Sequence, residues 1–246
     1  MIYFASDLHL GLYPLENSLK REKHFVKWLE NIKADATEIY LVGDVFDFWF
    51  EYKQVVPKGY VRLLGKLAEL VDSGIKIHFF SGNHDIWTFR YLADEIGLVL
   101  HHSPEIRTIN NKTLYIAHGD GLGPGDVGFK FLRIIFRNPI LQWFYSRIHP
   151  NIGMSIGLGW ARRRRHRIGF KEEFYGESKE RLIIHAKSVL KSRAIDFFIF
   201  GHRHIPISLD ISNTSKCFYI GDWIHQFSYL AFDGNTVNSC VFPMPE

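Results

Sequence analysis

The chain has 246 residues, of which 46% are hydrophobic and 15% aromatic, and its formal net charge is +4. This length and composition allow a large buried core, which excludes a disordered chain and favours one domain over two small ones. Two cysteines exclude a disulfide framework, and no uncharged apolar stretch reaches the roughly 18 residues that span a bilayer.

The first ten residues, MIYFASDLHL, enter a short apolar run directly, with neither a basic leader nor a small-residue cleavage site. A secretory signal peptide carries both features. We therefore expect a cytoplasmic protein, and this expectation allows attachment to the surface of a membrane.

Six short runs rich in Ile, Val, Phe and Tyr each end at a polar cluster, which is typical of buried strands. They are Ile2–Ala5, Glu38–Val42, Lys76–Phe80, 113–117, Phe197–Phe200 and 217–220. Apolar residues at helical spacing predict helices over Leu15–Ile32, 58–72 and 177–191. Strands that alternate with helices early in the chain, followed by strand-rich sequence, predict a layered α/β core.

Residues 127–171 differ in charge from the rest of the chain. No Asp or Glu occurs between Asp126 and Glu172, and the same stretch holds ten Lys or Arg, so the positive excess lies in this segment. Aromatic and aliphatic residues alternate there with basic ones at helical spacing, and Pro139 and Pro150 divide the pattern. We interpret the segment as a basic and apolar helical insertion in a single domain that spans the whole chain.

Polar clusters stand at the carboxyl ends of five predicted strands. They are Asp7-Leu8-His9, Gly43-Asp44-Val45-Phe46-Asp47, Gly82-Asn83-His84-Asp85, His118-Gly119-Asp120 and Gly201-His202-Arg203-His204. The strand ends of an open α/β sheet converge on one edge, where such folds bind their ligands. One such cluster arises often by chance, whereas five in this order form a specific signal.

This order resembles the calcineurin-like metallophosphoesterase family, with its DxH, GDxxD, GNH(D/E), lone His and GHxH motifs. The resemblance implies a layered αββα β-sandwich, flanked by helices, that binds two divalent metal ions. The ligands implied for one ion are Asp7, His9, Asp44 and His204. The ligands implied for the other are Asp44, Asn83, His118 and His202. Asp44 would therefore bridge the pair.

The types of these residues suit the chemistry. Mixed oxygen and imidazole donors without thiolate favour Mn, with Fe or Zn as alternatives. Two neighbouring cations clamp an in-line displacement at phosphorus and activate water near neutral pH, so no Ser or Cys nucleophile is required. In the family, the residue at His84 stabilises or protonates the leaving group. Asp47 or Asp85 is expected to orient imidazoles from behind the ligands.

Other polar residues receive no role in the site. The eight histidines outside the motifs are expected on the surface or in the ordinary core. Gly221-Asp222 resembles Gly43-Asp44 but lacks the second Asp of the GDxxD motif, so we interpret it as a turn.

The stretch HGDGLGPGDVGF, which runs from His118 to Phe129, precedes the basic helical segment. This arrangement is similar to the UDP-2,3-diacylglucosamine pyrophosphatases of lipid A synthesis, which release UMP and 2,3-diacylglucosamine 1-phosphate. The similarity implies that Asp126 contacts the substrate and that the insertion lines a cleft for the acyl chains. Known members carry Arg at the position of His84 and Tyr at that of Phe129.

The composition of 127–171 suits a nucleotide-lipid substrate, because acyl chains need apolar area and a diphosphate needs cations. The predicted substrate contacts are Asn83, His84, Asp126, His202, Arg162 and Arg163. Two interpretations of the arginine run from Arg162 to Arg165 carry equal weight. The run contacts phosphate or a membrane, or it is a charged helix face that contacts only solvent. Each Lys or Arg near an anionic lipid surface contributes about 1 kcal/mol. We thus expect peripheral contact with the cytoplasmic face of the inner membrane.

Three functions fit these patterns. The first is the lipid A pathway pyrophosphatase, and the second is a metallophosphoesterase for other nucleotides or phosphorylated small molecules. The third is a non-catalytic scaffold, against which the complete ligand set argues. Nucleic acid is not an expected partner, because aliphatic bulk interrupts the basic residues. The sequence leaves the oligomeric state open.

Overall fold

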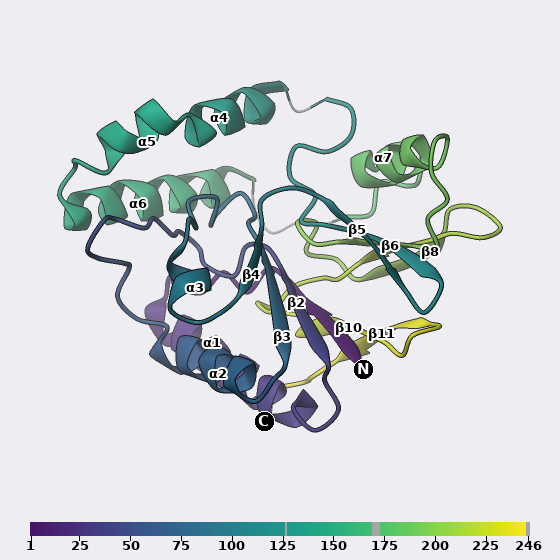
Figure 1. Cartoon of the computed structure of the whole chain (residues 1–246). Coiled ribbons are helices and arrows are strands. Elements are labelled where there is room, and N and C mark those ends of the chain that lie inside the picture. Colours follow the sequence, from purple (N-terminus) through teal and green to yellow (C-terminus); the bar gives the residue numbers. More distant parts are fainter. Residues whose placement is uncertain (126, 169–172, 245–246) are drawn as a thin grey trace.

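The computed structural model describes residues 1–125, 127–168 and 173–244, and two β-sheets pack face to face at its centre (Figure 1). The first sheet contains β11 (Val237–Val241), β10 (Ser228–Phe232), β1 (Ile2–Ala5), β2 (Glu38–Val42), β3 (Lys76–Phe80) and β4 (Val99–His101), in that order. The second contains β5 (Glu105–Ile109), β6 (Lys112–Ala117), β7 (Phe197–Phe200), β9 (Lys216–Tyr219) and β8 (Ile207–Asp210).

Helices cover the outer face of each sheet. The first sheet is covered by α1 (Leu15–Ile32), α2 (Val61–Asp72) and the short α3 (Tyr91–Asp94), and the second by α7 (Arg181–Val189). Three further helices, α4 (Val127–Arg137), α5 (Pro139–Tyr145) and α6 (Pro150–Ile168), lie together at one end of the molecule (Figure 1). The result is the predicted layered αββα arrangement, which the structure confirms.

The alternation of side chains along the strands explains the layers. In β1, Phe4 points into the core between the two sheets, whereas Tyr3 and Ala5 belong to the core beneath α1 and α2. In β7, Ile199 likewise faces the other sheet, and Phe198 packs toward α7. Because successive residues of a strand point to opposite faces, strands that are apolar throughout serve both cores.

The carboxyl ends of the central strands set the position of the site. In the first sheet, β1 pairs parallel with β2 and β2 with β3; in the second, β6 pairs parallel with β7 and β7 with β9. Parallel strands end at the same edge of their sheet, so the loops that follow them meet there.

Most predicted elements lie within one residue of their predicted bounds, but two helices are shorter. Helix α2 begins at Val61 rather than at residue 58, because Gly59 and Tyr60 adopt left-handed backbone angles that no α-helix contains. Helix α7 begins at Arg181 and ends at Val189, inside the predicted range 177–191. Strands β4, β5, β8, β10 and β11 and helix α3 were not among the predicted elements.

The segment 127–168 is helical, as its pattern indicates, and its prolines stand at helix starts. Pro139 is the first residue of α5 and Pro150 the first of α6. Proline is favoured there because its fixed φ suits a helix and its missing N–H would have no partner in the first turn. The Asn138 side chain caps α5 by accepting hydrogen bonds from the backbone N–H groups of Ile140 and Leu141.

An aromatic cluster holds the three helices against the core. Phe48, Phe50 and Trp87 form its buried part, and Phe136 and Tyr145 pack on it from α4 and α5. The indole N–H of Trp87 also donates to the backbone carbonyl of Phe136, at 2.7 Å. Among the described residues, no helix is long and apolar enough to cross a membrane.

Candidate metal centre

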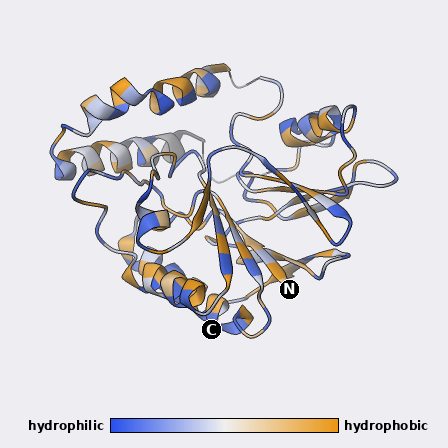
Figure 2. Ribbon diagram, viewed as in Figure 1, coloured by the Kyte–Doolittle hydropathy of each residue, from blue (hydrophilic) through white to orange (hydrophobic). Residues whose placement is uncertain are grey.

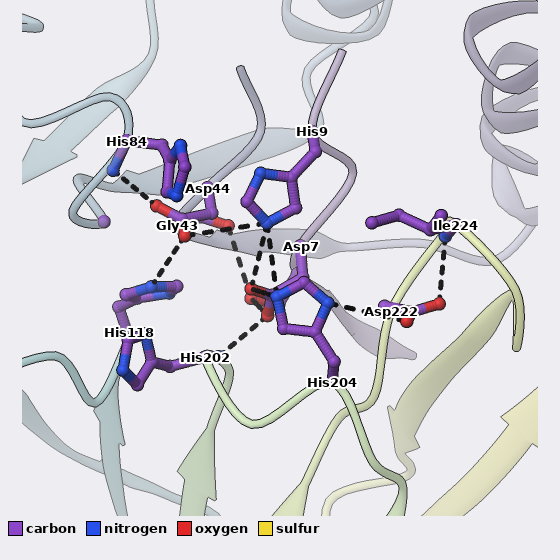
Figure 3. A network of polar contacts seen from close by, with 12 residues as sticks. Asp7, His9, Gly43, Asp44, His84, His118, His202, His204, Asp222 and Ile224 are labelled. Atoms are coloured by element: carbon purple, nitrogen blue, oxygen red, sulfur yellow. Dashed lines mark hydrogen bonds and ion pairs between the residues drawn. The ribbon is translucent and has the colours of Figure 1, made fainter. Parts of the chain in front are cut away.

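Loops from both sheets meet in one cluster of carboxylates and imidazoles (Figure 3). In each of three groups, one donor atom per residue lies within 4.8 Å of the others. The groups are Asp7, His9 and His204; Asp44, His118 and His202; and His9, Asp44 and His84. The first group holds three of the four ligands predicted for one ion, and the second holds three of the four predicted for the other. The third group connects them through Asp44 and adds His84, which was not predicted as a ligand.

Asp44 lies between the two sets. Its Oδ2 is 3.7 Å from His9 Nε2 and 3.3 Å from His118 Nε2. On the other side of His9, Asp7 Oδ1 lies 3.7 Å from His9 Nε2 and 3.2 Å from His204 Nε2. These short separations place one carboxylate oxygen within reach of both sets, which is what a bridging ligand needs.

Each carboxylate is held by one oxygen and presents the other. Asp7 Oδ2 accepts hydrogen bonds from the Ser6 hydroxyl and the backbone N–H of His202, at 2.7 and 2.8 Å. Asp44 Oδ1 accepts one from the backbone N–H of His84, at 2.8 Å. The remaining oxygens, Asp7 Oδ1 and Asp44 Oδ2, therefore face the imidazoles in a fixed orientation.

Two imidazoles are oriented in the same manner, because Nδ1 of His118 lies 2.9 Å from the carbonyl of Val42 and Nδ1 of His9 lies 3.2 Å from the carboxylate of Asp47. A hydrogen-bonded oxygen at Nδ1 favours the tautomer with the proton there, so Nε2 keeps its lone pair. For a third imidazole, that of His204, a carboxylate oxygen of Asp222 lies 3.5 Å from Nδ1. All three Nε2 atoms face the carboxylates.

The backbone at these residues is strained. Five of the seven predicted ligands have positive φ, between 44° and 67°. They are Asp7, His9, Asp44, His202 and His204. Such a conformation costs on the order of 1 kcal/mol for a residue with a Cβ, and it concentrates where function overrides local preference.

Neighbouring glycines allow the loops to approach closely. At Gly43, where φ is +85°, a Cβ would lie 2.5 Å from Nδ1 of His118. At Gly82, a Cβ would collide with the carboxylate of Asp44. Glycine is thus required at the second and third motifs because any side chain would displace a predicted ligand.

The cluster keeps its two inner carboxylates ionised. Burial alone would raise the pKa of Asp7, yet the nearby His204 and His9 hold it well below its usual range. Burial likewise opposes ionisation of Asp44, and the adjacent His118 holds its pKa well below the usual value. When the imidazoles are neutral, as metal ligands must be, two ionised carboxylates in a buried site favour bound cations, because burying uncompensated charge is costly.

Several atoms that could bind a metal ion have no hydrogen-bond partner among the described residues. They are Asp7 Oδ1, Asn83 Oδ1 and His118 Nε2, all buried. Buried polar atoms normally have a partner, and those that lack one usually belong to a site for an ion, water or reaction. A pair of divalent ions therefore fits these residues. Asn83 itself lies in the loop whose His84 N–H binds Asp44.

The two predicted supporting carboxylates contact different groups. Asp47 contacts His9, as described, and Asp85 binds backbone instead of an imidazole. Asp85 accepts hydrogen bonds from the N–H groups of Gly82 and Val45, at 2.7 and 2.8 Å, and so ties the third motif to the second. Burial, followed by the charge of Asp44, raises the pKa of Asp85 to about 7.

Asp222 lies in the site although its sequence pattern indicated only a turn. It does form a turn, because its Oδ1 accepts hydrogen bonds from the N–H groups of Ile224, His225 and Gln226. Its Oδ2, however, contacts His204 (Figure 3). The position of Asp222 in the sequence could have indicated this contact. Asp222 follows β9, which is parallel to β7, so it lies at the same edge of the sheet as the GHxH motif.

His84 stands between the cluster and a large apolar cavity. Its Nδ1 donates to the carbonyl of Asp47 at 2.8 Å, and its ring packs edge-on against His9. Burial lowers the pKa of His84 to about 4. This histidine is thus fixed by its backbone partner, and its side chain forms part of the cavity wall.

The cavity, which we call the apolar chamber, has a volume of about 380 Å³. Asp47, Asn83 and His84 form its end at the cluster. The other walls come from the core and the three helices and are apolar except for Gln142: Phe48, Ile86, Trp87, Leu132, Ile135, Phe136, Leu141, Gln142, Tyr145, Ile156, Gly157, Trp160 and Ala161. Its volume lies in the range of small-molecule sites.

Arg162 and Arg163, two further predicted substrate contacts, belong to none of the donor groups and do not line the apolar chamber. Arg162 and Arg163 are exposed on α6, and the guanidinium of Arg162 lies 4.9 Å above the ring of Tyr13. Asp126 and the end of the predicted insertion, 169–171, lie outside the described residues.

Comparisons with known proteins agree with this geometry. Residues 1–206 match the family described as calcineurin-like phosphoesterase. The UDP-2,3-diacylglucosamine hydrolase of Porphyromonas gingivalis is 36% identical over 249 residues, which cover 96% of this chain and 95% of that protein. The UDP-2,3-diacylglucosamine hydrolase of Edwardsiella ictaluri is 24% identical and covers 98% of this chain and 91% of its own length.

Proposed function

Because the chain belongs to the calcineurin-like phosphoesterase family, we propose that it hydrolyses the pyrophosphate bond of UDP-2,3-diacylglucosamine in lipid A biosynthesis. The products are UMP and 2,3-diacylglucosamine 1-phosphate. One observation carries the choice of substrate: an apolar chamber opens directly onto the cluster of carboxylates and imidazoles. A purely water-soluble nucleotide has no group that would gain from such a wall.

Family membership implies a dinuclear metal site, and we assign the ions to manganese. The proposed ligands of one ion are Asp7, His9, Asp44 and His204, and those of the other are Asp44, Asn83, His118 and His202. Oxygen and imidazole donors without thiolate suit manganese. When bound, such a pair polarises phosphoryl oxygens and activates water near neutral pH.

Other residues near the cluster are proposed to bind the leaving group or to position the ligands. We assign His84 to the leaving phosphate, because it stands at the boundary between the cluster and the apolar chamber. Its Nδ1 is occupied by the Asp47 carbonyl, so the group offered to substrate is Nε2, which donates when protonated. Asp47, Asp85 and Asp222 act as positioning residues for the ligands and their loops.

The lipid half of the substrate lies in the apolar chamber in this proposal. The acyl chains would displace water from walls formed by the three helices, at about 25 cal/mol for each Å² of apolar surface removed from water. Arg162 and Arg163, at the exposed face of α6, are proposed to meet anionic groups of the substrate or of the surrounding lipid.

We further propose that the protein works in the cytoplasm, on the inner face of the inner membrane. Support comes from large apolar side chains that are exposed on the three helices. They include Phe131, Ile134, Ile140, Trp143, Phe144 and Ile152. Figure 2 shows apolar residues along α4 and α5. Exposed Arg147 lies 4.6 Å from the Trp143 ring, which combines a cation and an aromatic ring at this surface.

Purified protein loaded with manganese tests the proposal through release of UMP from UDP-2,3-diacylglucosamine. Asp44→Asn should lower turnover about a thousandfold, because it weakens the only ligand shared by both ions. Asp210→Asn, at an exposed carboxylate of β8, is the matched control and should retain full turnover. Equal turnover by the two variants would refute the site. Hydrolysis of soluble nucleotides without hydrolysis of the lipid would refute the substrate.

A further inference from the structure

A second cavity adjoins the metal centre, on the side of His202. Its volume is about 360 Å³, and we call it the polar pocket. Its walls include Tyr175, Lys179, Arg181 and Arg203, together with glycines of the loop that follows β6. Charged and polar groups line this space together with Leu122 and Leu182, whereas the apolar chamber is lined mostly by carbon.

The wall of the polar pocket is rigidly built. The guanidinium of Arg203 binds the buried carboxylate of Glu180 through two hydrogen bonds, at 2.8 and 3.1 Å. Glu180 also accepts the backbone N–H of Tyr175 at 3.1 Å, and the Arg203 guanidinium lies 5.6 Å from the Tyr175 ring. Bidentate pairing fixes the plane of a guanidinium, so the tyrosine, arginine and glutamate form one prearranged surface.

The two cavities reach the metal centre through different residues. The apolar chamber reaches it through Asn83 and His84, and the polar pocket through His202. The ring of His202 packs against that of His118, whose Nε2 faces Asp44. The apolar chamber therefore adjoins the cluster at Asn83 and His84, and the polar pocket adjoins it at His202.

We propose that the polar pocket binds the nucleoside half of the substrate, namely the ribose and the pyrimidine base of the uridine nucleotide. This inference rests on the proposed function, because it assigns the second end of a substrate whose diphosphate lies at the metal centre. A two-ended substrate with one lipid and one nucleotide needs two unlike cavities, and these two meet that need.

The chemistry of the pocket matches a nucleoside phosphate. The Tyr175 ring is about half exposed and offers a face on which a base can stack. Among the described residues that line the pocket, Lys179, Arg181 and Arg203 contribute cationic groups and Glu180 a carboxylate, which suits a ligand that carries a phosphate. Ribose hydroxyls find donors and acceptors among the same side chains.

A third cavity, of about 310 Å³, is the rival position. It is lined by residues near the start of α1, including Tyr13, Asn17 and Lys20, and by the turn at His225. Its lining includes none of the seven proposed ligands. A nucleoside held there would have no direct continuation onto the metal centre, so we use this cavity as the control.

Calorimetric titration of the manganese-loaded protein with UMP and, separately, with inorganic phosphate tests the proposal. Phosphate reports the metal centre alone, and the difference between the two probes reports the nucleoside. Tyr175→Ala and Lys179→Ala should each weaken UMP binding about tenfold and leave phosphate binding unchanged. Tyr175→Phe should retain UMP affinity, since the aromatic face remains. Lys20→Ala should change neither.

Other results would overturn the assignment. They are a wild-type protein that binds UMP no better than phosphate, pocket variants with unchanged UMP affinity, pocket variants that lose both probes equally, and an effect of Lys20→Ala on UMP. The proposed function is judged separately, by UMP release from the lipid substrate. If the protein binds UMP through Tyr175 but does not cleave UDP-2,3-diacylglucosamine, the assignment of the polar pocket holds and the proposed function is refuted. If it cleaves this lipid but the pocket variants bind UMP normally, the proposed function holds and the assignment of the pocket is refuted.

Discussion

His204 occupies its position through two carboxylates, one on each side of its ring. Nε2 faces Asp7 at 3.2 Å, and Nδ1 lies 3.5 Å from Oδ2 of Asp222. The carboxylate of Asp222 therefore lies where it can pair with the Nδ1 side of a proposed ligand. The second oxygen of Asp222, which accepts three backbone N–H groups, holds the carboxylate itself in place.

Asp222→Asn isolates this contact. The amide oxygen can still accept the three backbone hydrogen bonds, while the neutral NH₂ group that replaces Oδ2 can neither accept a hydrogen bond from His204 nor pair with its charge. Manganese affinity should fall about tenfold, the lower end of the range for such supporting residues. Calorimetric titration with manganese measures it. Asp233→Asn is the control, because Asp233 caps an exposed turn in the same way, at Asn235 and Thr236. Equal manganese affinity in both variants would contradict the role of Asp222.

For single residues, the sequence predicted the site residues that belong to a recognisable motif. It missed a residue that reaches the site only through the folding of the chain. Six of the residues in the donor groups were predicted as ligands, since their order along the chain is distinctive. Asp222 was set aside because a Gly-Asp pair alone is common in turns. Asp85 was expected beside an imidazole, yet it binds backbone N–H groups. Which atom a carboxylate contacts depends on loop geometry, and sequence order does not encode it.

Helix α6 meets the core through glycines at helical spacing. A Cβ on Gly157 would collide with the ring of Phe48, and one on Gly153 would collide with the hydroxyl of Tyr52. The face of α6 that carries these two glycines thus lies against the core. Ile156 and Trp160 of the same helix line the wall of the apolar chamber. The distance between α6 and the core defines the width of that chamber.

Gly157→Ala should push α6 away from Phe48 and disturb the chamber. We expect a loss of stability of about 1–3 kcal/mol, as for overpacking elsewhere, and a raised KM for the lipid substrate. Gly159→Ala is the matched control on the same helix, because a Cβ there meets nothing within 4 Å. It should stabilise the helix by about 0.5–1 kcal/mol. Urea unfolding and substrate titration measure both, and identical behaviour of the two variants would contradict this account.

Strands that are continuous apolar runs were predicted well, whereas the half-exposed strands β8 and β11, and also the buried strand β10 with its sequence SYLAF, were not. The central strands β1, β2, β3 and β7 are continuous apolar runs, which explains their recognition. Strand β8 alternates between partly buried and exposed residues, and β11 is largely exposed. Their sequences, ISLD and VNSCV, carry little apolar signal. Such edge strands owe their conformation to pairing with a neighbour, and this is a tertiary effect.

Of the twenty large apolar side chains that are exposed among the described residues, ten lie on α4, α5 and α6. Trp143 and Phe144 are 53% and 60% exposed, and they lie on helices that also line the apolar chamber. Soluble monomers rarely expose many large apolar side chains together, so this surface indicates a partner. The basic residues of the same segment favour an anionic one.

Sedimentation with vesicles that contain phosphatidylglycerol tests the membrane proposal. Trp143→Ser combined with Phe144→Ser should reduce the bound fraction several-fold, while hydrolysis of a soluble phosphodiester stays unchanged. Added salt should release wild-type protein in part, because ionic attraction to the surface is screened. Val61→Ser, at an exposed residue of α2, is the control and should bind as wild type does. Undiminished binding of the double variant would exclude these aromatic residues as the anchor.

Neither sheet holds a full set of donors. Asp7, His9, Asp44 and Asn83 follow strands of the first sheet, and His118, His202 and His204 follow strands of the second. Each proposed coordination sphere draws on both, so a cation acts as a cross-link between the two halves of the sandwich. Ions that bind only the assembled state stabilise it by mass action. A bound cation would therefore oppose separation of the two sheets in addition to their shared apolar interior.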